Sequence, residues 1–504
     1  MLCRLHTATV IGVEAVPIEV EVEAGLGLPG FHLVGLPDNA MREGAVRIRT
    51  ALAQSGFKLG SVRLTVNLAP AELRKDGASF DLPIALGGLL ARGLTTFDPR
   101  STLLAGELAL DGRLRPIRGA LTIAEGARRW GFNALLLPRV NAAEAALVNG
   151  LRVHGVDSLN EAVALLSGAI EATATPPPPP LPTARVGEPD FAEVCGQSAA
   201  RRAAEVAAAG GHNLLLIGPP GAGKTMIARR LAGVLPAMSP DEAIETTRVH
   251  SVAGLLNEVG LVRQRPFRAP HHTCSSAGLI GGGSHPRPGE VSLAHNGVLF
   301  LDELPEFQRP TLEALRQPLE SGHVTIVRAR LALTFPARFM LVAAMNPCPC
   351  GYRGSGIRCC TCGEREAQRY ANRVSGPLLD RFDLFVRVAP VPTAQVIAPG
   401  ANEPSAALAA RVTAARERQR RRYARSAIHC NAQLSARALQ RHVQLSPASR
   451  GLLAQQAERQ GLSARAVHRC CRVARTLADL DATETVTDEQ VALALALQQE
   501  RSLG

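Results

Sequence analysis

Lysine, aromatic side chains and long apolar runs are all scarce in this sequence of 504 residues. Aromatic residues make up 3% of the chain, with one Trp and three Tyr, so we expect no broad platform on which nucleic-acid bases could stack. No apolar run approaches the roughly 18 residues that a membrane helix needs, so we expect no spanning segment. The first residues lack a secretion signal, and eleven cysteines are too few for a disulfide scaffold of this length. We therefore expect a cytoplasmic protein.

The scarcity of lysine makes each lysine informative. Only Lys58, Lys75 and Lys224 are present among the 56 basic residues, and the rest are arginines. A site that needs an ammonium group therefore has three candidates. The formal net charge of +12 permits an anionic partner such as nucleic acid without establishing one.

The length predicts two or three domains, and a proline-rich stretch gives the clearest boundary. Five consecutive prolines, Pro176–Pro180, favour a stiff extended spacer, although a surface loop within one domain is the alternative. We predict a domain at 1–172, a linker at 173–188, a second domain at 189–396 and a helical region at 397–504. The first domain should be mixed α/β, with strands at Ile18–Val22, Val62–Leu68, Leu135–Leu137 and Val153–Val156 and helices at Asp38–Gln54 and Ser79–Leu90.

A glycine-rich loop in the second domain predicts a phosphate site. The short apolar strand Leu214–Ile217 precedes the loop, and the helical pattern of Thr225–Leu235 follows it. Backbone N–H groups of such a loop surround phosphates, Lys224 would contact the β- and γ-phosphates of ATP, and Thr225 would bind Mg²⁺. The loop and the residue after it are Gly218, Pro219, Pro220, Gly221, Ala222, Gly223, Lys224, Thr225 and Met226.

Two further strands should place polar groups near this loop. Asp302 and Glu303 follow the apolar run Val298–Leu301, where a carboxylate can hold Mg²⁺ and its neighbour can polarise an attacking water. Asn346 ends the run Met340–Met345 and could orient that water, because the carboxyl ends of parallel strands meet at one edge. The alternatives are an ordinary acidic strand end and an Asn that caps a turn before Pro347.

Five longer segments carry a resemblance to a known family: Arg265–Thr273, Pro288–Phe307, Ala343–Gly351, Ser375–Leu384 and Gly461–Arg469. Together with the phosphate loop they resemble a magnesium-chelatase-like AAA+ ATPase, more closely the YifB/ComM family, over nearly the whole chain. The resemblance implies an α/β fold with an AAA+ parallel-sheet core and a C-terminal helical lid. It also implies a homo-oligomer, expected to be a hexameric ring, that acts on branched or single-stranded DNA in recombination or natural transformation.

The resemblance also assigns roles to two arginines. Arg381 is similar to the arginine finger that reaches a neighbouring subunit's γ-phosphate, and Arg465 is similar to a sensor arginine that contacts the nucleotide of its own subunit. A surface salt bridge is the alternative for both.

The first domain resembles the domain of Lon proteases, but with an altered dyad. The segment 75–79 aligns with the stretch that carries the catalytic serine of that family, so Ser79 is the equivalent residue. Gly106-Glu107 aligns with the later stretch that carries the catalytic lysine. The position of the catalytic lysine is occupied by Leu121, which cannot accept a proton. We expect a Lon-like domain that is not a peptidase.

Four cysteines form a candidate structural zinc site. Cys348 and Cys350 lie on one side of a nine-residue loop, and Cys360 and Cys362 lie on the other. Four thiolates can hold Zn²⁺ tetrahedrally, although the C-x-C spacing is tighter than usual and reduced, metal-free cysteines are the alternative.

Two arginine-rich segments could contact DNA. Arg328 and Arg330 interrupt the run Val324–Thr334 and could form the tip of a hairpin, where the alternative is a pair of solvated arginines. The segment Arg411–Arg425 holds seven arginines and one acid, and we favour a solvated face of the helical lid there.

The function best supported by these features is a Mg-ATPase that remodels DNA. A chelatase-type motor subunit that drives metal insertion into a tetrapyrrole is one alternative, and an ATP-regulated scaffold is another.

Overall fold

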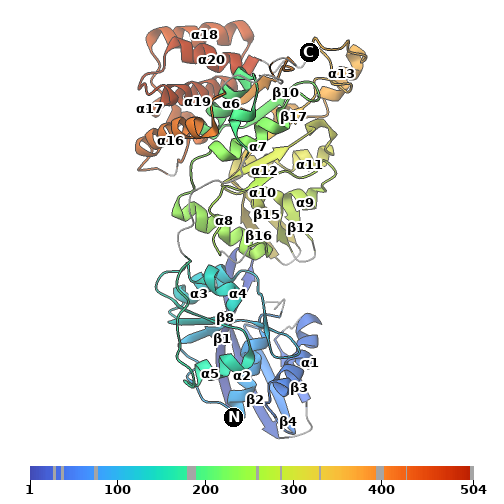
Figure 1. Cartoon of the computed structure of the whole chain (residues 1–504), viewed down its shortest axis with the longest axis vertical. Helices are drawn as coiled ribbons and strands as arrows, with labels where there is room; N and C mark the ends of the chain where they lie inside the picture. Colours follow the sequence, from blue (N-terminus) through green and yellow to red (C-terminus); the bar gives the residue numbers. More distant parts are fainter. Residues whose placement is uncertain are drawn as a thin grey trace.

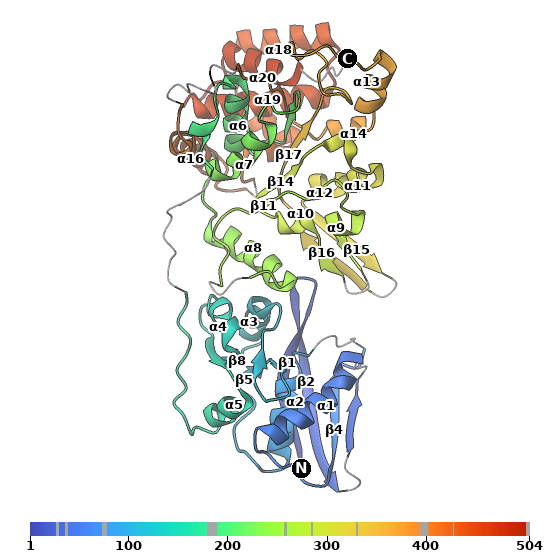
Figure 2. The same cartoon turned by 45° about the vertical axis from the view of Figure 1, so that its right-hand side comes forward.

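The computed structural model describes residues 1–26, 30–35, 39–72, 78–178, 189–256, 260–283, 286–328, 331–392, 395, 402–426 and 428–499. It is elongated, with an N-terminal α/β part at one end, a second sheet in the middle and a group of helices at the other end (Figures 1 and 2). The predicted linker at 173–188 falls partly on residues 179–188, outside the described residues. None of the described helices is both long and apolar enough to cross a bilayer.

The N-terminal part is built on a seven-stranded mixed sheet, in the order β3-β4-β2-β1-β5-β8-β9. Its centre is the antiparallel pair β1 (Leu2–Ile11) and β2 (Glu14–Leu26), which sequence analysis recognised only in part. Helix α2 (Asp81–Ala91) packs so closely on this pair that a Cβ at Gly87 would lie 2.6 Å from Val22. The other strands are β3 (Gly30–Val34), β4 (Val62–Ala69), β5 (Thr102–Leu104), β8 (Ala134–Pro138) and β9 (Arg152–Val156), and the other helices are α1 (Asn39–Gln54), α3 (Ala120–Arg129), α4 (Arg139–Ala145) and α5 (Leu159–Leu166).

The second part is a five-stranded parallel sheet in the order β11-β14-β17-β10-β18. Its inner strands are continuous apolar runs because helices cover both faces of such a sheet. The strands are β10 (Leu214–Ile217), β11 (Phe267–Arg268), β14 (Val298–Leu301), β17 (Met340–Met345) and β18 (Leu384–Arg387). The strand order places the carboxyl ends of β14, β17 and β10 side by side, which confirms the predicted AAA+ type of α/β fold.

A hairpin and several helices are inserted between these strands. The predicted hairpin is present as β15 (His323–Arg328) and β16 (Leu331–Pro336). Helices α6 (Ser198–Gly210) and α7 (Lys224–Val234) flank β10, and α8 (Pro240–Ala253) lies toward the N-terminal part (Figure 2). Short elements complete this part: α9 (Ser276–Ile280), β12 (Gly281–Gly282), β13 (Arg287–Pro288), α10 (Glu290–Leu293), α11 (Arg309–Glu313), α12 (Arg316–Ser321), α13 (Glu364–Ala371) and α14 (Gly376–Leu379).

The C-terminal part is helical, as the sequence predicts. A buried carboxylate organises it: Asp479 accepts hydrogen bonds from Arg475 at 3.0 Å and Asn431 at 2.8 Å and pairs with Arg422. These partners offset the cost of burying the charge. The helices are α16 (Ser405–Arg422), α17 (Ala436–His442), α18 (Pro447–Gln460), α19 (Ala464–Leu480) and α20 (Asp488–Gln499).

The N-terminal part contacts the second part through α3 and through the turn between β1 and β2, among other places. Glu125 of α3 accepts a hydrogen bond from Arg248 of α8 at 2.7 Å. The turn between β1 and β2 rests on the hairpin, where a Cβ at Gly12 would lie 3.6 Å from Leu333 of β16. The first domain therefore packs on the hairpin, in addition to its connection to the second part through the chain.

Candidate active site

The glycine-rich loop joins β10 to α7 at the carboxyl edge of the parallel sheet. Gly221 and Gly223 have φ values of 77° and 89°, in the left-handed region that favours glycine. Gly218 is required for a different reason, because a Cβ there would lie 2.3 Å from the carbonyl oxygen of Val388. The loop conformation thus depends on its glycines, and helix α7 begins directly at Lys224.

Lys224 is buried and linked to a second strand. Its Nζ donates to the carbonyl oxygens of Gly218 at 2.6 Å and Pro219 at 2.9 Å, and to Oδ1 of Asn346 at 3.0 Å. Burial lowers the pKa of Lys224, and the charges of Asp302 and Glu303 oppose that shift. The structure therefore brings together Lys224 and Asn346, two side chains that the sequence predicted to lie near the phosphate site.

Asp302 lies beside the first turn of α7. Its Oδ2 accepts a hydrogen bond from Oγ1 of Thr225 at 2.6 Å, and its Oδ1 accepts one from the backbone N–H of Glu303 at 3.0 Å. A hydroxyl and a carboxylate oxygen at this separation suit Mg²⁺, which prefers hard oxygen ligands. The predicted magnesium ligands are thus neighbours in space although 77 residues separate them.

Glu303 has a histidine neighbour that comes from another segment of the chain. Its side chain is 57% exposed, and its Oε2 lies 3.4 Å from Nδ1 of His272. The ring of His271 packs against that of His272 with centroids 4.1 Å apart. The histidine pair follows β11, which neighbours β14 in the sheet. That adjacency is the signal that could have located His272.

Arg381 lies just after α14 and is held on several sides. Its guanidinium pairs with Glu320, and burial, followed by the charges of Arg465 and Arg316, lowers its pKa. Its carbonyl oxygen accepts a hydrogen bond from the Asn213 side chain at 2.8 Å. Arg465, one of the charges that lower this pKa, is exposed at the start of α19.

Asn213 and Arg469 are two residues that sequence analysis missed. Oδ1 of Asn213 accepts from the N–H of Leu341, so this side chain ties the segment after α14 to the first residues of β17. Arg469 of α19 donates to the carbonyl oxygen of Phe382 at 2.6 Å. Both the sheet and the lid therefore fix the position of Arg381.

The candidate DNA residues receive less support. The side chains of Arg328 and Arg330 lie outside the described residues, and only the strands of their hairpin are described. In the arginine-rich helix α16, Arg411 pairs with Glu403 and Glu205, while other arginines bind backbone oxygens and Asp479. Much of that basic segment is therefore engaged in contacts within the lid and with α6 of the core.

In the N-terminal part, the carbonyl oxygen of Ser79 accepts a hydrogen bond from the N–H of Gly106 at 2.8 Å, so the two segments matched to Lon proteases meet. Leu121 is only 1% exposed and packs as an apolar residue. Lys75 lies outside the described residues.

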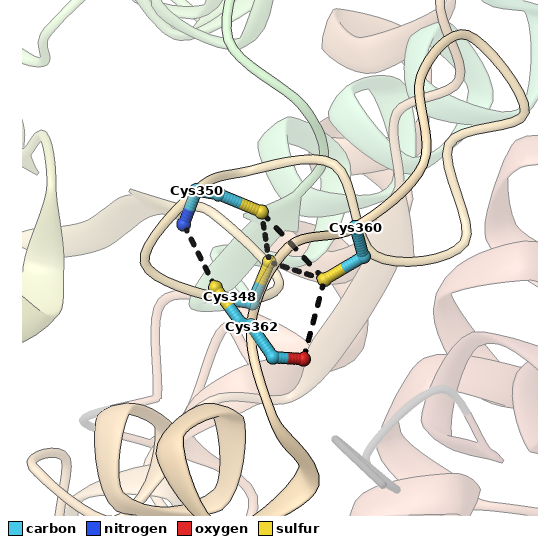
Figure 3. A group of neighbouring side chains, drawn as sticks. All are labelled: Cys348, Cys350, Cys360 and Cys362. Atoms are coloured by element: carbon cyan, nitrogen blue, oxygen red, sulfur yellow. Dashed lines mark hydrogen bonds between the residues drawn. The ribbon is translucent and has the colours of Figure 1, made fainter.

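The four cysteines 348, 350, 360 and 362 converge after the end of β17 (Figure 3). Their sulfur atoms all lie within 4.8 Å of one another, which is the spacing of a four-thiolate metal site. The structure thus groups the four residues that the sequence pattern selected.

Comparisons with known proteins agree along the whole chain. Family models match residues 18–141 (subunit ChlI of Mg-chelatase), 190–396 (magnesium chelatase, subunit ChlI) and 402–498 (its C-terminal part). A protein named YifB from Salmonella typhimurium is 44% identical, covering 97% of this chain and 96% of its own length. Competence protein ComM from Haemophilus influenzae is 42% identical, covering 98% and 97%. Lon protease 2 from Thermus thermophilus is 26% identical over 32% of this chain and 22% of its own length.

Proposed function

The chain belongs to the YifB/ComM family of magnesium-chelatase-like AAA+ proteins, and from that premise we propose that it is a Mg-ATPase that couples hydrolysis to remodelling of branched or single-stranded DNA. The observation that carries the ATPase part is the joint arrangement of Lys224 with Asn346 and of Thr225 with Asp302 at one sheet edge. Groups suited to phosphate, magnesium and a water come together there from three strands, which supports the proposal.

Each residue has a proposed role in hydrolysis. Lys224 would neutralise the β- and γ-phosphates, while Thr225 and Asp302 would hold Mg²⁺, whose charge would offset that of the phosphates. Glu303 polarises the attacking water, and Asn346 orients it. The backbone of Gly218–Gly223 surrounds the phosphates, with Met226 beside them on α7.

Arg381 is proposed to act on the nucleotide of a neighbouring subunit. Arg465 is proposed to contact the nucleotide of its own subunit, as the family resemblance implies, while Arg381 reaches across the interface between subunits. Such an arrangement requires a ring of identical subunits, which we propose to be a hexamer located in the cytoplasm.

We divide the chain into a Lon-like domain (1–172) without peptidase activity, a linker (173–188), the ATPase core (189–396) and the helical lid (397–504). Leucine at position 121 supports the loss of peptidase activity, because it offers no amine to activate Ser79. The proposed cofactors are ATP, Mg²⁺ and a structural Zn²⁺ held by the four-cysteine cluster.

The DNA part is supported by the basic net charge, by the hairpin β15–β16 and by the relationship to a competence protein. Steady-state ATP hydrolysis should be measured with and without four-way DNA at low and high salt. We expect stimulation by DNA that weakens as salt rises, because phosphate contacts release counterions. A rate of ATP hydrolysis that does not change when DNA is added, together with no DNA binding at low salt, would refute the coupling of hydrolysis to DNA.

The ATPase part has its own test. Glu303→Gln should bind ATP and hardly hydrolyse it, whereas Lys224→Ala should abolish binding in calorimetry. Near wild-type turnover by Glu303→Gln would reject the role of Glu303.

A chelatase-type motor is the second candidate, favoured by the family models that match most of the chain. It predicts stimulation by a tetrapyrrole-binding partner protein instead of DNA.

A further inference from the structure

The cysteine cluster has the geometry of a closed tetrahedral metal site. The Sγ atom of Cys348 lies 3.4 Å from that of Cys350 and 3.6 Å from that of Cys360, and the last two are 3.6 Å apart. A tetrahedron with zinc–sulfur bonds of about 2.3 Å has sulfur atoms roughly 3.8 Å apart, whereas a disulfide requires about 2.05 Å. The arrangement therefore suits a metal ion better than a disulfide.

The fourth sulfur completes the site. Cys362 accepts a hydrogen bond from the backbone N–H of Cys350 at 3.3 Å, which joins the two ends of the intervening loop (Figure 3). Such N–H···S bonds are typical of the surroundings that orient metal-bound thiolates. Four protein ligands leave no open position, so the metal would have a structural role.

The loop is also anchored next to the sheet. Cys348 is fully buried, and its carbonyl oxygen accepts a hydrogen bond from the N–H of Gly351 at 2.9 Å. On the outer side, Arg353 donates to Glu364 at the start of α13 at 2.7 Å. The cysteine loop, residues 348–362, thus begins at a buried residue and is held to α13 by an ion pair.

This loop touches the phosphate loop directly. At Gly351, where φ is 85°, an added Cβ would lie 2.6 Å from Cδ of Pro220 and 3.8 Å from Cγ of Asn346. Asn346, which accepts the hydrogen bond from Lys224, is two residues before Cys348. An interaction that holds Cys348 and Gly351 in place therefore also restrains Asn346 and one side of the phosphate loop.

We propose that the cysteine loop is a metal-held brace of the nucleotide site: Zn²⁺ bound by Cys348, Cys350, Cys360 and Cys362 holds Asn346 and Gly351 against the phosphate loop. Without the metal, a loop stapled only by weak thiol contacts samples other conformations, and ATP must order it at a cost in affinity. This inference rests on the proposed ATPase function and adds a second metal that controls it.

The metal itself is tested first, on the full-length protein purified without added metal. Mass spectrometry of the metal content should find about one zinc per chain. Replacement by Co²⁺ should give the absorption bands of a tetrahedral thiolate site, a readout independent of activity. Cys360→Ser should lose both signals, while Cys359→Ser is the matched control because Cys359 is exposed in the same loop and outside the cluster. Absence of metal, or equal loss in the control, overturns the site.

The brace is tested by ATP binding. Removing zinc with a chelator should weaken Mg-ATP binding in calorimetry by roughly tenfold, and adding zinc back should restore it. Gly351→Ala keeps all four ligands, so it should retain the cobalt spectrum yet bind ATP more weakly, because its Cβ meets Pro220. Unchanged ATP affinity in both cases would overturn the brace. If the zinc-loaded protein bound no ATP at all, the proposed function would fail, while the cobalt spectrum would still decide the metal site.

Discussion

The ammonium group of Lys224 and the side-chain oxygen of Asn346 lie 3.0 Å apart, so the first residue of α7 and the residue after β17 form one unit. This hydrogen bond connects the group proposed to hold the phosphates with the group proposed to orient water. A movement of β17 or of the segment that follows it is thereby transmitted to the phosphate loop.

Replacing Asn346 should separate catalysis from binding. We expect Asn346→Ala to lower kcat by roughly a hundredfold, the typical cost of losing one hydrogen-bonding group that acts on the transition state. KM should change much less, because the phosphate loop keeps its glycines and Lys224. Steady-state kinetics combined with calorimetric titration of Mg-ATP provides the measurement. A kcat near the wild-type value would show that Asn346 only caps a turn.

Arg381 should act between subunits. Arg381→Ala is expected to lower kcat by about a thousandfold, as for other arginines that stabilise a transferring phosphoryl group. Mixing Arg381→Ala chains with inactive Lys224→Ala chains should restore part of the activity, because some interfaces then combine an intact phosphate loop with an intact Arg381. Glu320→Gln serves as the control, since it removes only the partner of Arg381. No recovery on mixing would place the action of Arg381 within its own subunit.

His272 should position Glu303. Its imidazole lies 3.4 Å from the Glu303 carboxylate, so His272→Ala should lower kcat by about tenfold, less than the loss of a general base itself. KM should stay nearly constant, and His272→Gln should recover part of the rate by restoring a hydrogen-bonding group. The matched control is His271→Ala, because His271 bonds to Thr273 instead. Equal effects of the two alanine variants would indicate that the pair serves packing alone.

The sequence predicted an element best where the residues of that segment alone decide its structure. The strand Val298–Leu301 was predicted to the residue, because an apolar run of this length followed by acids is typical of a buried parallel strand. β1 was overlooked because polar and apolar residues in Leu2–Ile11 alternate with interruptions. Its identity depends on pairing with β2.

The same difference between local and distant constraints separates the residues of the candidate site. Lys224 and Asp302 lie in patterns that carry their own structural context, so their roles could be predicted from spacing. Asn213 and His272 act through contacts with segments far away in the chain, and spacing carries no information on such contacts. Strand order supplies it, because β11 neighbours β14 and β10 neighbours β17.

The Lon-like domain should not cleave protein. Leu121 is buried and offers no amine at the position that the resemblance assigns to the catalytic lysine. We expect no cleavage of unfolded casein by the wild-type chain, with or without ATP. Ser79→Ala should therefore leave both the protein pattern on gels and the ATPase rate unchanged. Cleavage that disappears in Ser79→Ala would require another base near Ser79.

The pairing of Glu245 with His295 should make stability depend on pH in the acidic range. The hydrogen bond from His295 is the main cause that lowers the pKa of Glu245 from 4.5 to about 2. A carboxylate with a depressed folded-state pKa stabilises the protein above its unfolded pKa, and this contribution is lost as pH falls from about 4.5 toward 2. Because the Glu245 side chain is 47% exposed, we expect about 1 kcal/mol at most.

Glu245→Gln should accordingly lower the melting temperature by a few degrees at neutral pH. The difference from the wild-type protein should shrink as the pH is lowered below about 4.5, because the wild-type carboxylate becomes protonated there and loses the same interaction. Calorimetric scans of both chains at several pH values provide the comparison, and each pH serves as the control for the others. A difference that stays constant down to the acid limit would mean that Glu245 stabilises α8 by packing and not by its charge.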